Sequence, residues 1–330
     1  MSNMNLNKFL SSIYINIFKI LPASINRAFS KFFKKLHDMN LQSSYASDFL
    51  AEMNIEDVKF KLWLMKNDVQ AQSVYQPLHK KKISYETIMI KAMVSVIKKL
   101  DIKNFLDLGS FMGYYACFAS KYFDKELNVY AIESNPKYSD YIKKSLIEND
   151  FQNIKIINEI LSNSEEDLFV HKEGVYNTNI TNKEIQVKKS ITLDKICIEQ
   201  KINPELIKID VHGAEGKVLL GSKNILQNLV KVILLELHTT KYIEKFSDGS
   251  SRKEIIEYLI SLNFKCYLIS SFRDFEKSID LQNKFNLNKK FQHIEINKQN
   301  FDQIFFDRDQ NDQFIFACKN NINIKSFDCF

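Results

Sequence analysis

The chain has 330 residues, enough for one large α/β domain with an extension and too many for a peptide or a small disulfide-knotted domain. Hydrophobic residues make up 45% of the sequence and charged residues 26%, which excludes wholesale disorder and a polytopic membrane protein. The formal net charge of +6 falls short of the clustered basicity of a nucleic-acid-binding module.

Residues 1–40 combine basic side chains with apolar ones at helical spacing, which predicts a basic amphipathic helix. No apolar run in this segment approaches the ~20 residues that a membrane span requires, and Pro22 interrupts the pattern. Such a helix could dock on an anionic membrane surface or on a partner, or it could cover the domain that follows. Residues 41–82 also look helical and polar, so we expect residues 1–84 to form a helical, basic extension.

From residue 85 onward, short apolar runs alternate with helical segments. Helices are predicted between seven strands, which cover residues 105–108, 128–132, 154–157, 206–209, 230–237, 266–269 and 314–318. Because such alternation favours parallel pairing through crossovers, we expect an α/β fold over residues 85–330, with a doubly wound, mostly parallel, seven-stranded sheet. Small antiparallel strands are expected in residues 163–193, and an irregular insertion in residues 271–313.

Glycine is scarce in this sequence. There are only seven glycines, about a third of the ~7% average usage. Five of them fall in two clusters, Gly109 with Gly113, and Gly213 with Gly216 and Gly221. Glycines used this sparingly indicate positive φ angles or a backbone that approaches a ligand closely. We therefore expect a ligand at both clusters.

The first cluster follows a predicted strand and opens a helix, the place where open α/β sheets bind ligands. Phe111 stands where a dinucleotide fingerprint needs its middle glycine, which disfavours NAD and an oxidoreductase. Glu133, at the end of the next strand, is placed to accept hydrogen bonds from two ribose hydroxyls, and Asp107 to attract an ammonium group. S-adenosylmethionine has a ribose and a cationic end but no phosphate. The predicted cofactor contacts are Asp107, Gly109, Ser110, Gly113, Glu133 and Ser134.

Acids and histidines gather after the later strands. Asp210, His212 and Glu215 follow one strand, and Glu236 and His238 end the next, at the same edge of the sheet. This set suits deprotonation of a hydroxyl that attacks a sulfonium methyl group, and histidine is the natural base near neutral pH.

We therefore predict Asp210, His212 and His238 as catalytic residues, with Glu215 and Glu236 at the active edge. Two alternatives stay open at this point. Either histidine could be a hydrogen-bonded structural residue, or Asp210, Glu236 and His238 could bind a divalent metal ion that acidifies the hydroxyl. No metal signature exists in the spacing, so a metal is not favoured.

Five sequence strings together resemble the FkbM family of S-adenosylmethionine-dependent O-methyltransferases in order and spacing. They are Asp107-Leu-Gly-Ser-Phe-Met-Gly-Tyr-Tyr, Glu133-Ser-Asn-Pro, Leu161-Ser162, Lys208-Ile-Asp-Val-His-Gly-Ala-Glu and Glu236-Leu-His. The similarity covers about residues 84–270, and Tyr85-Glu86 resembles a Tyr-Glu pair of that family. It implies a Rossmann-like, class I methyltransferase sheet. It also implies cofactor contacts at Asp107, Gly109, Gly113 and Glu133, and an active edge at Asp210 and Glu215.

Two positions depart from the family pattern. The family commonly has Asn where Phe111 stands and Glu where His212 stands. The first change could weaken cofactor affinity. The second could shift the catalytic base or mark a loss of activity.

The sequence thus predicts an S-adenosylmethionine-dependent methyltransferase (EC 2.1.1.-) that methylates a hydroxyl of a sugar, glycan or secondary metabolite, a preference that rests on the family resemblance. The alternative is a non-catalytic pseudoenzyme that binds cofactor or glycan and is recruited to the membrane surface by its N-terminal helix. Phe111 and His212 motivate this alternative.

The five cysteines are odd in number and form no C-x-x-C pair, which argues against a disulfide framework and a zinc ribbon. We therefore expect a cytoplasmic protein, with residues 1–40 as a candidate peripheral contact to a membrane. The expected partner is a small-molecule or glycan substrate and not a nucleic acid. No feature of the sequence predicts the oligomeric state.

Overall fold

A computed structural model of the chain describes residues 47–66, 85–171, 174–176, 186–246, 250–270, 293–306 and 312–330, and single positions between 68 and 75. The amphipathic helix predicted in residues 1–40 lies outside these described residues.

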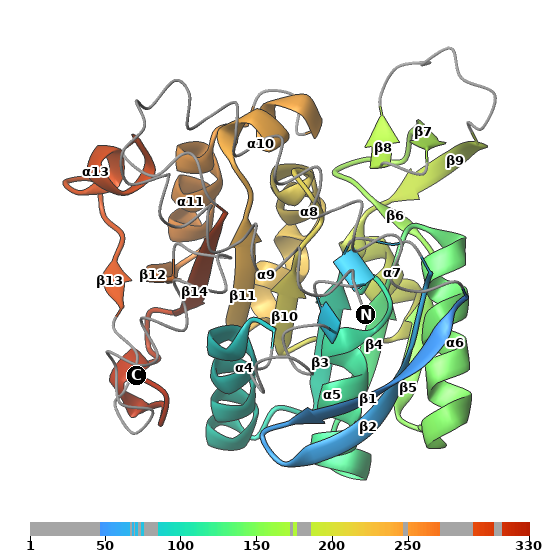
Figure 1. Cartoon of the computed structure of the whole chain (residues 1–330). Coiled ribbons are helices and arrows are strands. Elements are labelled where there is room, and N and C mark those ends of the chain that lie inside the picture. The colour runs from blue at the N-terminus through green and yellow to red at the C-terminus, as the bar shows by residue number, and fades with distance from the viewer. Residues whose placement is uncertain are drawn as a thin grey trace, which may run out of the picture. The chain divides into compact units, whose positions relative to one another are not determined.

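The main sheet has eight strands in the order β13-β12-β14-β11-β10-β3-β4-β5 (Figure 1). Five neighbouring strands pair in parallel: β3 (Asn104–Leu108), β4 (Asn128–Ile132), β5 (Ile154–Ile157), β10 (Leu206–Ile209) and β11 (Val232–Leu237). The other three pair antiparallel: β12 (Phe264–Ser270), β13 (Ile294–Glu295) and β14 (Gln313–Lys319). The predicted α/β fold with a mostly parallel sheet is confirmed.

The strand count differs from the prediction by one. The seven predicted strands all form, and β13 adds an eighth at the edge of the sheet, beside β12. A strand of two residues is too short to show a hydrophobic period, so no sequence pattern could indicate it. It lies in the segment 271–313 that we expected to be irregular, where α13 (Phe301–Phe306) also forms.

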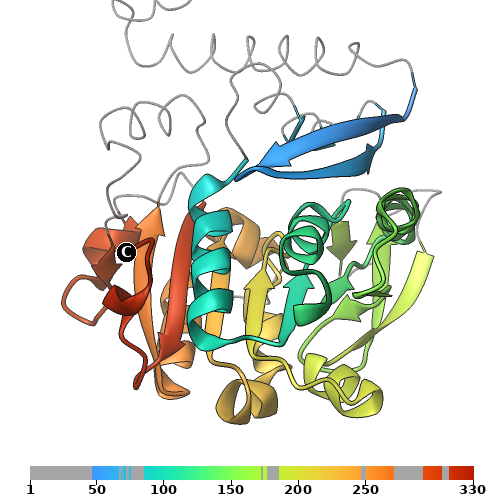
Figure 2. The ribbon, with the colours of Figure 1, turned by 90° about the horizontal axis from the view of Figure 1, so that it is seen from below.

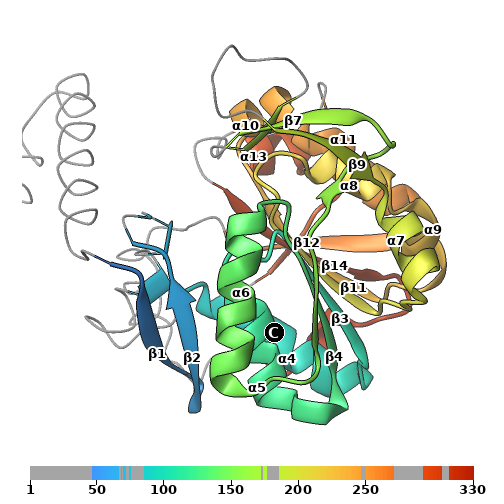
Figure 3. The same ribbon diagram turned by 90° about the vertical axis from the view of Figure 1, so that its right-hand side faces the viewer.

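Helices cover both faces of the sheet (Figures 2 and 3). One face carries α4 (Thr87–Leu100), α5 (Tyr114–Phe123) and α6 (Pro136–Asn149). The other carries α7 (Leu193–Gln200), α8 (Glu215–Leu220), α9 (Lys223–Asn228) and α11 (Arg252–Ser261). Because both faces are covered, the residues of β10 and β11 are buried without alternation, as is typical of parallel strands in a doubly wound fold.

A β-hairpin lies on the outer side of α5 and α6 (Figures 2 and 3). It consists of β1 (Phe49–Ile55) and β2 (Val58–Leu64), joined by Glu56 and Asp57, whose φ angles are 46° and 64°. Two successive residues with positive φ are typical of the tight turns that match the twist of a hairpin. Residues 50–64 form one compact unit with residues 74–330.

The helical structure that we predicted for residues 41–82 is therefore wrong for residues 49–64. Their apolar residues alternate with period two, and the buried members are Ala51, Met53, Ile55, Phe60, Leu62 and Leu64. That alternation is the pattern of a half-buried strand. The division of the chain at residue 84 stays a prediction.

The expected small strands in residues 163–193 form as β7, β8 and β9. Together with β6, which lies before this segment, they make a second, four-stranded sheet in the order β6-β9-β7-β8. These are β6 (Ile160–Leu161), β7 (Asp167–His171), β8 (Gly174–Tyr176) and β9 (Gln186–Ile191). β7 pairs antiparallel with β8 and β9, as predicted, whereas β6 pairs parallel with β9.

The remaining described elements are α10 (Thr240–Phe246) and the short helical turns η1 (Asp124–Glu126) and η2 (Ile324–Ser326). Within the described part of the chain, no helix combines the length and the hydropathy that a membrane crossing requires.

Candidate functional site

The candidate site lies where the chain leaves the carboxyl ends of β3, β4, β10 and β11. These strands are neighbours in the sheet and run in parallel, so the loops that follow them meet at one edge. All predicted site residues come from the ends of these strands and the loops after them. The predicted cofactor residues follow β3 and β4, and the predicted catalytic residues follow β10 and β11.

The loop after β3 is shaped by two glycines in the left-handed region. Gly109 has a φ of 76°, and a Cβ at this position would lie 1.8 Å from the carbonyl oxygen of Asp210. Gly113 has a φ of 86° and precedes α5. The N–H groups of Gly109 and Ser110 donate to the carbonyl of Ile132, at 2.9 and 3.1 Å. The loop is thus held between the end of β4 and the turn after β10.

Asp107 is completely buried near the end of β3. The Ser110 hydroxyl donates to its backbone carbonyl at 2.7 Å, while neither side-chain oxygen has a hydrogen-bond partner among the described residues. Burial raises the pKa of Asp107, and the nearby ammonium group of Lys208 partly opposes this shift. The Asp107 carboxyl is therefore available to a cationic ligand.

Lys208 is a site residue that our sequence analysis missed. Its Nζ lies 3.2 Å from Oδ2 of Asp210 and 3.9 Å from Oδ1 of Asp107, and 4.7 Å from the centre of the Tyr115 ring. Burial favours the neutral amine, but these carboxylates outweigh it and raise the pKa of Lys208. A lysine in the middle of a fully buried strand was the signal that could have revealed it.

Glu133 follows β4 and is 7% exposed. Its Oε2 accepts from the N–H of Phe111 and its Oε1 from the N–H of Asn135, both at 2.8 Å. The hydroxyl of Ser134 lies 3.5 Å from Oε1. Burial raises the pKa of Glu133 to about 7, although the two N–H donors favour the charged form. Each oxygen keeps capacity for a further donor, as a ribose hydroxyl would provide.

Phe111 occupies a backbone conformation that suits Asn better than Phe. Its φ is 51°, in the left-handed region that asparagine tolerates best among the larger residues. Its ring packs edge-on against Tyr138 on α6, with ring centres 4.6 Å apart. The departure from the family pattern at Phe111 therefore leaves the loop's bond to Glu133 in place, since that bond uses only the backbone.

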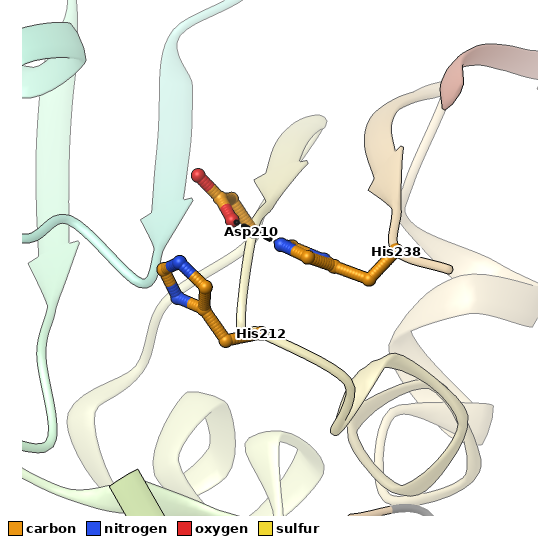
Figure 4. Close-up of side chains that lie close together, drawn as sticks. All are labelled: Asp210, His212 and His238. Carbon is orange, nitrogen blue, oxygen red and sulfur yellow. Dashed lines mark ion pairs between the residues drawn. The ribbon is translucent and has the colours of Figure 1, made fainter. Parts of the chain in front are cut away.

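The acids and histidines after β10 and β11 meet around His238 (Figure 4). Nε2 of His238 lies 3.7 Å from Oδ1 of Asp210, and Nδ1 lies 2.7 Å from Oε1 of Glu215. The same Glu215 oxygen accepts from the N–H of Gly213 at 3.0 Å. His212 is exposed, and its ring centre lies 4.9 Å from that of His238.

His238 is 2% exposed and surrounded by negative charge. Burial alone would lower its pKa, but the carboxylates of Glu215, Asp210 and Glu236 outweigh burial and raise the pKa to about 10. The surrounding carboxylates thus favour the protonated ring, which can donate protons, over the neutral ring, which could accept one.

The two histidines and three acids form two groups that could hold an ion. In one, Asp210, His212 and His238 offer ligand atoms within 4.8 Å of one another. In the other, Glu236 and His238 are joined by Asp312, within the same limit. The ligand set that we considered from the sequence, Asp210 with Glu236 and His238, is thus divided between two groups that share His238. Asp312 precedes β14, and no motif marked it.

Two further residues support this edge. Arg252 is buried and donates from Nε to the carbonyl of His238 at 2.6 Å and from Nη2 to that of Leu237 at 3.2 Å, which fixes the chain after β11. Glu86 accepts from the Tyr115 hydroxyl at 2.6 Å. The Tyr-Glu pair ahead of the first strand of the main sheet is thereby tied to α5, whose Tyr115 ring lies under Lys208.

Comparison with known proteins gives a family for the central segment. Residues 104–266 match the family model described as methyltransferase FkbM domain. No curated protein sequence matches the chain.

Three solved structures illustrate the similarity found among known folds. Methyltransferase FkbM from Methylobacillus flagellatus KT is 12% identical over 66% of this chain and 44% of that chain, with a TM-score of 0.41. Precorrin-6y C5,15-methyltransferase from Geobacter metallireducens GS-15 is 13% identical over 73% of this chain and 92% of that chain, with a TM-score of 0.35. TYW2 from M. jannaschii, in complex with AdoMet, is 12% identical over 83% of this chain and 87% of that chain, with a TM-score of 0.34. This chain thus spans less than half the length of the first of these proteins.

Proposed function

Residues 104–266 of this chain match the FkbM methyltransferase family model, and from that premise we propose that the chain belongs to this family and is an S-adenosylmethionine-dependent O-methyltransferase. The proposed acceptor is a hydroxyl of a sugar, glycan or secondary metabolite. The observation that carries the proposal is an excess of buried acid at one edge of the sheet. The acids, each at most 15% exposed there, are Asp107, Glu133, Asp210, Glu215 and Glu236. The buried cations beside them are Lys208, His238 and Arg252.

Such an excess of carboxylates favours a cationic ligand, because buried negative charge is costly without a positive partner. S-adenosylmethionine, when bound, supplies a sulfonium methyl group that an oxygen nucleophile can take. The residues present fit this cofactor: the buried Asp107 carboxyl suits its ammonium group, and the Glu133 carboxyl suits its ribose hydroxyls.

The acceptor hydroxyl would be activated beside Asp210, His212 and His238, which converge from β10 and β11 (Figure 4). Lys208 holds Oδ2 of Asp210, which leaves Oδ1 directed toward His238. Because the surrounding carboxylates favour the protonated form of His238, this side chain would hold positive charge near a developing oxyanion rather than accept the proton. His212, which is exposed, is the group that an acceptor can reach first.

Cofactor binding tests this proposal directly. We expect wild-type protein to bind S-adenosylmethionine in calorimetric titration, and Asp107→Asn and Glu133→Gln each to weaken binding by about tenfold or more, the usual worth of a buried charged hydrogen bond. Glu199→Gln is the matched control, because Glu199 is an exposed acid on α7, away from the loops of the site. No binding at millimolar cofactor, or equal affinity in all four proteins, would contradict the proposal.

A second candidate function is a pseudoenzyme that binds cofactor or glycan without transfer. Two features favour it: His212 stands where the family commonly has an acid, and the carboxylates around His238 raise its pKa, which makes it a poor base. Incubation with methyl-labelled cofactor and a cell-envelope glycan extract separates the two candidates. Transfer of label to any glycan rejects the pseudoenzyme, whereas cofactor binding without transfer to any extract supports it.

A further inference from the structure

The orientation of His238 is set by an acid behind it. Its Nδ1 lies 2.7 Å from Oε1 of Glu215, a completely buried carboxylate that the N–H of Gly213 also holds. An ionised carboxylate can only accept, so we assign a proton to Nδ1. Metal-binding histidines ordinarily donate their second N–H to a carboxylate in this way, which fixes the ring and makes the other nitrogen a stronger ligand.

The other ring nitrogen, Nε2, lies among oxygens at distances that are too long for hydrogen bonds. Oδ1 of Asp210 is 3.7 Å away and Oε1 of Glu236 is 4.0 Å away, and Nε2 has no hydrogen-bond partner in the described part of the chain. Bonds to a divalent metal ion measure about 2.0–2.2 Å, so two ligands of one ion lie at most about 4.4 Å apart. The space between Nε2 and Asp210 therefore fits an ion without movement of the strands that carry them.

His212 supplies a third ligand beside these two. It stands in the turn after β10 with a φ of 52°, and its ring lies next to that of His238 (Figure 4). Asp210, His212 and His238 each offer one ligand atom, and these three atoms all lie within 4.8 Å of one another. His212 is exposed, whereas Oδ1 of Asp210 and Nε2 of His238 are buried, so a substrate oxygen would approach the ion from the side of His212.

We propose that Asp210, His212 and His238 bind one divalent transition-metal ion, with Glu215 as the positioning residue behind His238. The ion takes the place of the proton on Nε2 of His238, which is released to solvent on binding, while the proton on Nδ1 stays. Two imidazoles and one carboxylate favour ions of the manganese-to-zinc series over magnesium or calcium, which prefer oxygen ligands alone. Glu236 and Asp312, on further sides of His238, add negative charge that stabilises a dication.

The role of the ion rests on the proposed function. An acceptor hydroxyl bound beside the ion would lose its proton to water at lower pH, since a divalent ion stabilises the resulting oxyanion. The O–H bond breaks, the electron pair stays on oxygen, and the proton leaves with solvent. The replacement of the family's acid by His212 would then mark a change in how the hydroxyl is activated rather than a loss of activity.

Cobalt titration tests the site without cofactor or acceptor. The full chain is freed of metal with a chelator and titrated with CoCl₂, and visible absorption of the bound ion is recorded. We expect one equivalent to bind to wild-type protein and His212→Ala to weaken this binding by about tenfold or more. His293→Gln is the matched control, since His293 packs against Tyr267 and Phe330, outside the group, and is expected to leave cobalt affinity unchanged.

Each outcome decides the inference. The site is overturned by a wild-type chain that shows no cobalt absorption, or by equal affinity in wild type, His212→Ala and His293→Gln. Calorimetric titration of the metal-free chain with S-adenosylmethionine runs in parallel. Cofactor binding without cobalt binding would leave the proposed function standing and remove the metal site, whereas the converse result would keep the metal site and remove the proposed function.

Discussion

Gly109 is required by a contact between two stretches of backbone. A side chain at this position would begin 1.8 Å from the Asp210 carbonyl oxygen, well inside van der Waals contact, and the φ of 76° adds strain for any other residue. The loop after β3, which carries predicted cofactor contacts, and the turn that carries the predicted catalytic residues thus touch through their main chains. Gly109 is therefore required, first of all, by the way these two loops pack.

We expect Gly109→Ala to destabilise the fold by about 3 kcal/mol or more, because a left-handed alanine is strained and the backbone after β10 must shift. Urea unfolding measures this. Gly216→Ala is the control, since the nearest atom to its added Cβ is the Ser250 hydroxyl at 3.0 Å and an alanine in α8 gains helix propensity. The control should stay within about 1 kcal/mol of wild type. Equal unfolding midpoints for the two variants would refute the backbone explanation.

At the scale of elements, the β1–β2 hairpin is joined to α6 by side chains that satisfy its backbone. The N–H of Lys61 donates to Oδ1 of Asn149, and its carbonyl accepts from Nδ2 of the same residue, both at 2.7 Å. The N–H of Trp63 donates to the Ser145 hydroxyl at 2.9 Å. An open strand edge would otherwise invite pairing with another chain. The hairpin is therefore an integral layer over the helices that shape the cofactor side of the sheet.

Removal of one aromatic ring from the hairpin should lower the stability of the unit that contains it. Phe60 is 4% exposed and packs edge-on against Phe118 of α5, with ring centres 6.4 Å apart. We expect Phe60→Ala to lower the free energy of unfolding by roughly 3 kcal/mol, as for a ring in a domain core. The neighbouring Lys59→Ala, on the exposed side of β2, is the control and should change it by less than about 0.5 kcal/mol. A loss below 1 kcal/mol for Phe60→Ala would show that the hairpin contributes little.

At the scale of the whole molecule, the parallel sheet concentrates acids from four separate loops at one edge. Asp107, Glu133, Asp210 and Glu236 follow or end four neighbouring strands and are all at most 15% exposed. Burial disfavours each charge, and their mutual repulsion adds to the effect, as the raised pKa of Glu133 shows. Without its ligands, the protein therefore retains electrostatic strain at the edge that its ligands would occupy.

This strain predicts a dependence of stability on pH. Glu133 has a pKa of about 7 in the folded chain, whereas an unperturbed glutamate has a pKa of 4.5, so the folded state favours the neutral form of Glu133. The stability that this neutral form contributes is present below pH 4.5 and is lost as the pH rises through 7. Relative to wild type, Glu133→Gln should therefore gain stability between pH 5 and 8, by up to about 3 kcal/mol.

The midpoint of thermal unfolding, measured for both proteins without cofactor across this range, checks the prediction. Glu199→Gln is the control: because the Glu199 carboxyl is exposed, this variant should follow wild type at every pH. A constant difference between Glu133→Gln and wild type from pH 5 to 8 would show that Glu133 is ionised throughout.

Local patterns determined much of this protein in advance. The alternation of apolar strands with helices predicted the mostly parallel sheet, because that signal lies within a few residues of sequence. The two glycine clusters mark the turns after β3 and β10, which meet where Gly109 packs against the Asp210 carbonyl, and ligand binding at these turns stays a prediction. The sequence analysis predicts helix where the hairpin forms, because the segment as a whole is polar, although Ala51, Met53 and Ile55 alternate as in a strand. The alternation extends over only seven residues in each strand, too few to outweigh the polar composition of the surrounding segment.

Only the tertiary structure decided the chemistry within the site. The sequence placed His212 and His238 at one edge as equivalent candidates for a base. Folding brings Glu215, the first residue of α8, against Nδ1 of His238 and so raises the pKa of that ring, and it leaves His212 exposed. Lys208 between Asp107 and Asp210, and Asp312 beside His238, likewise depend on strands that are far apart in the chain. Charge states and ligand sets arise from such long-range contacts, since a pKa depends on burial and neighbouring charge and not on the residue type alone.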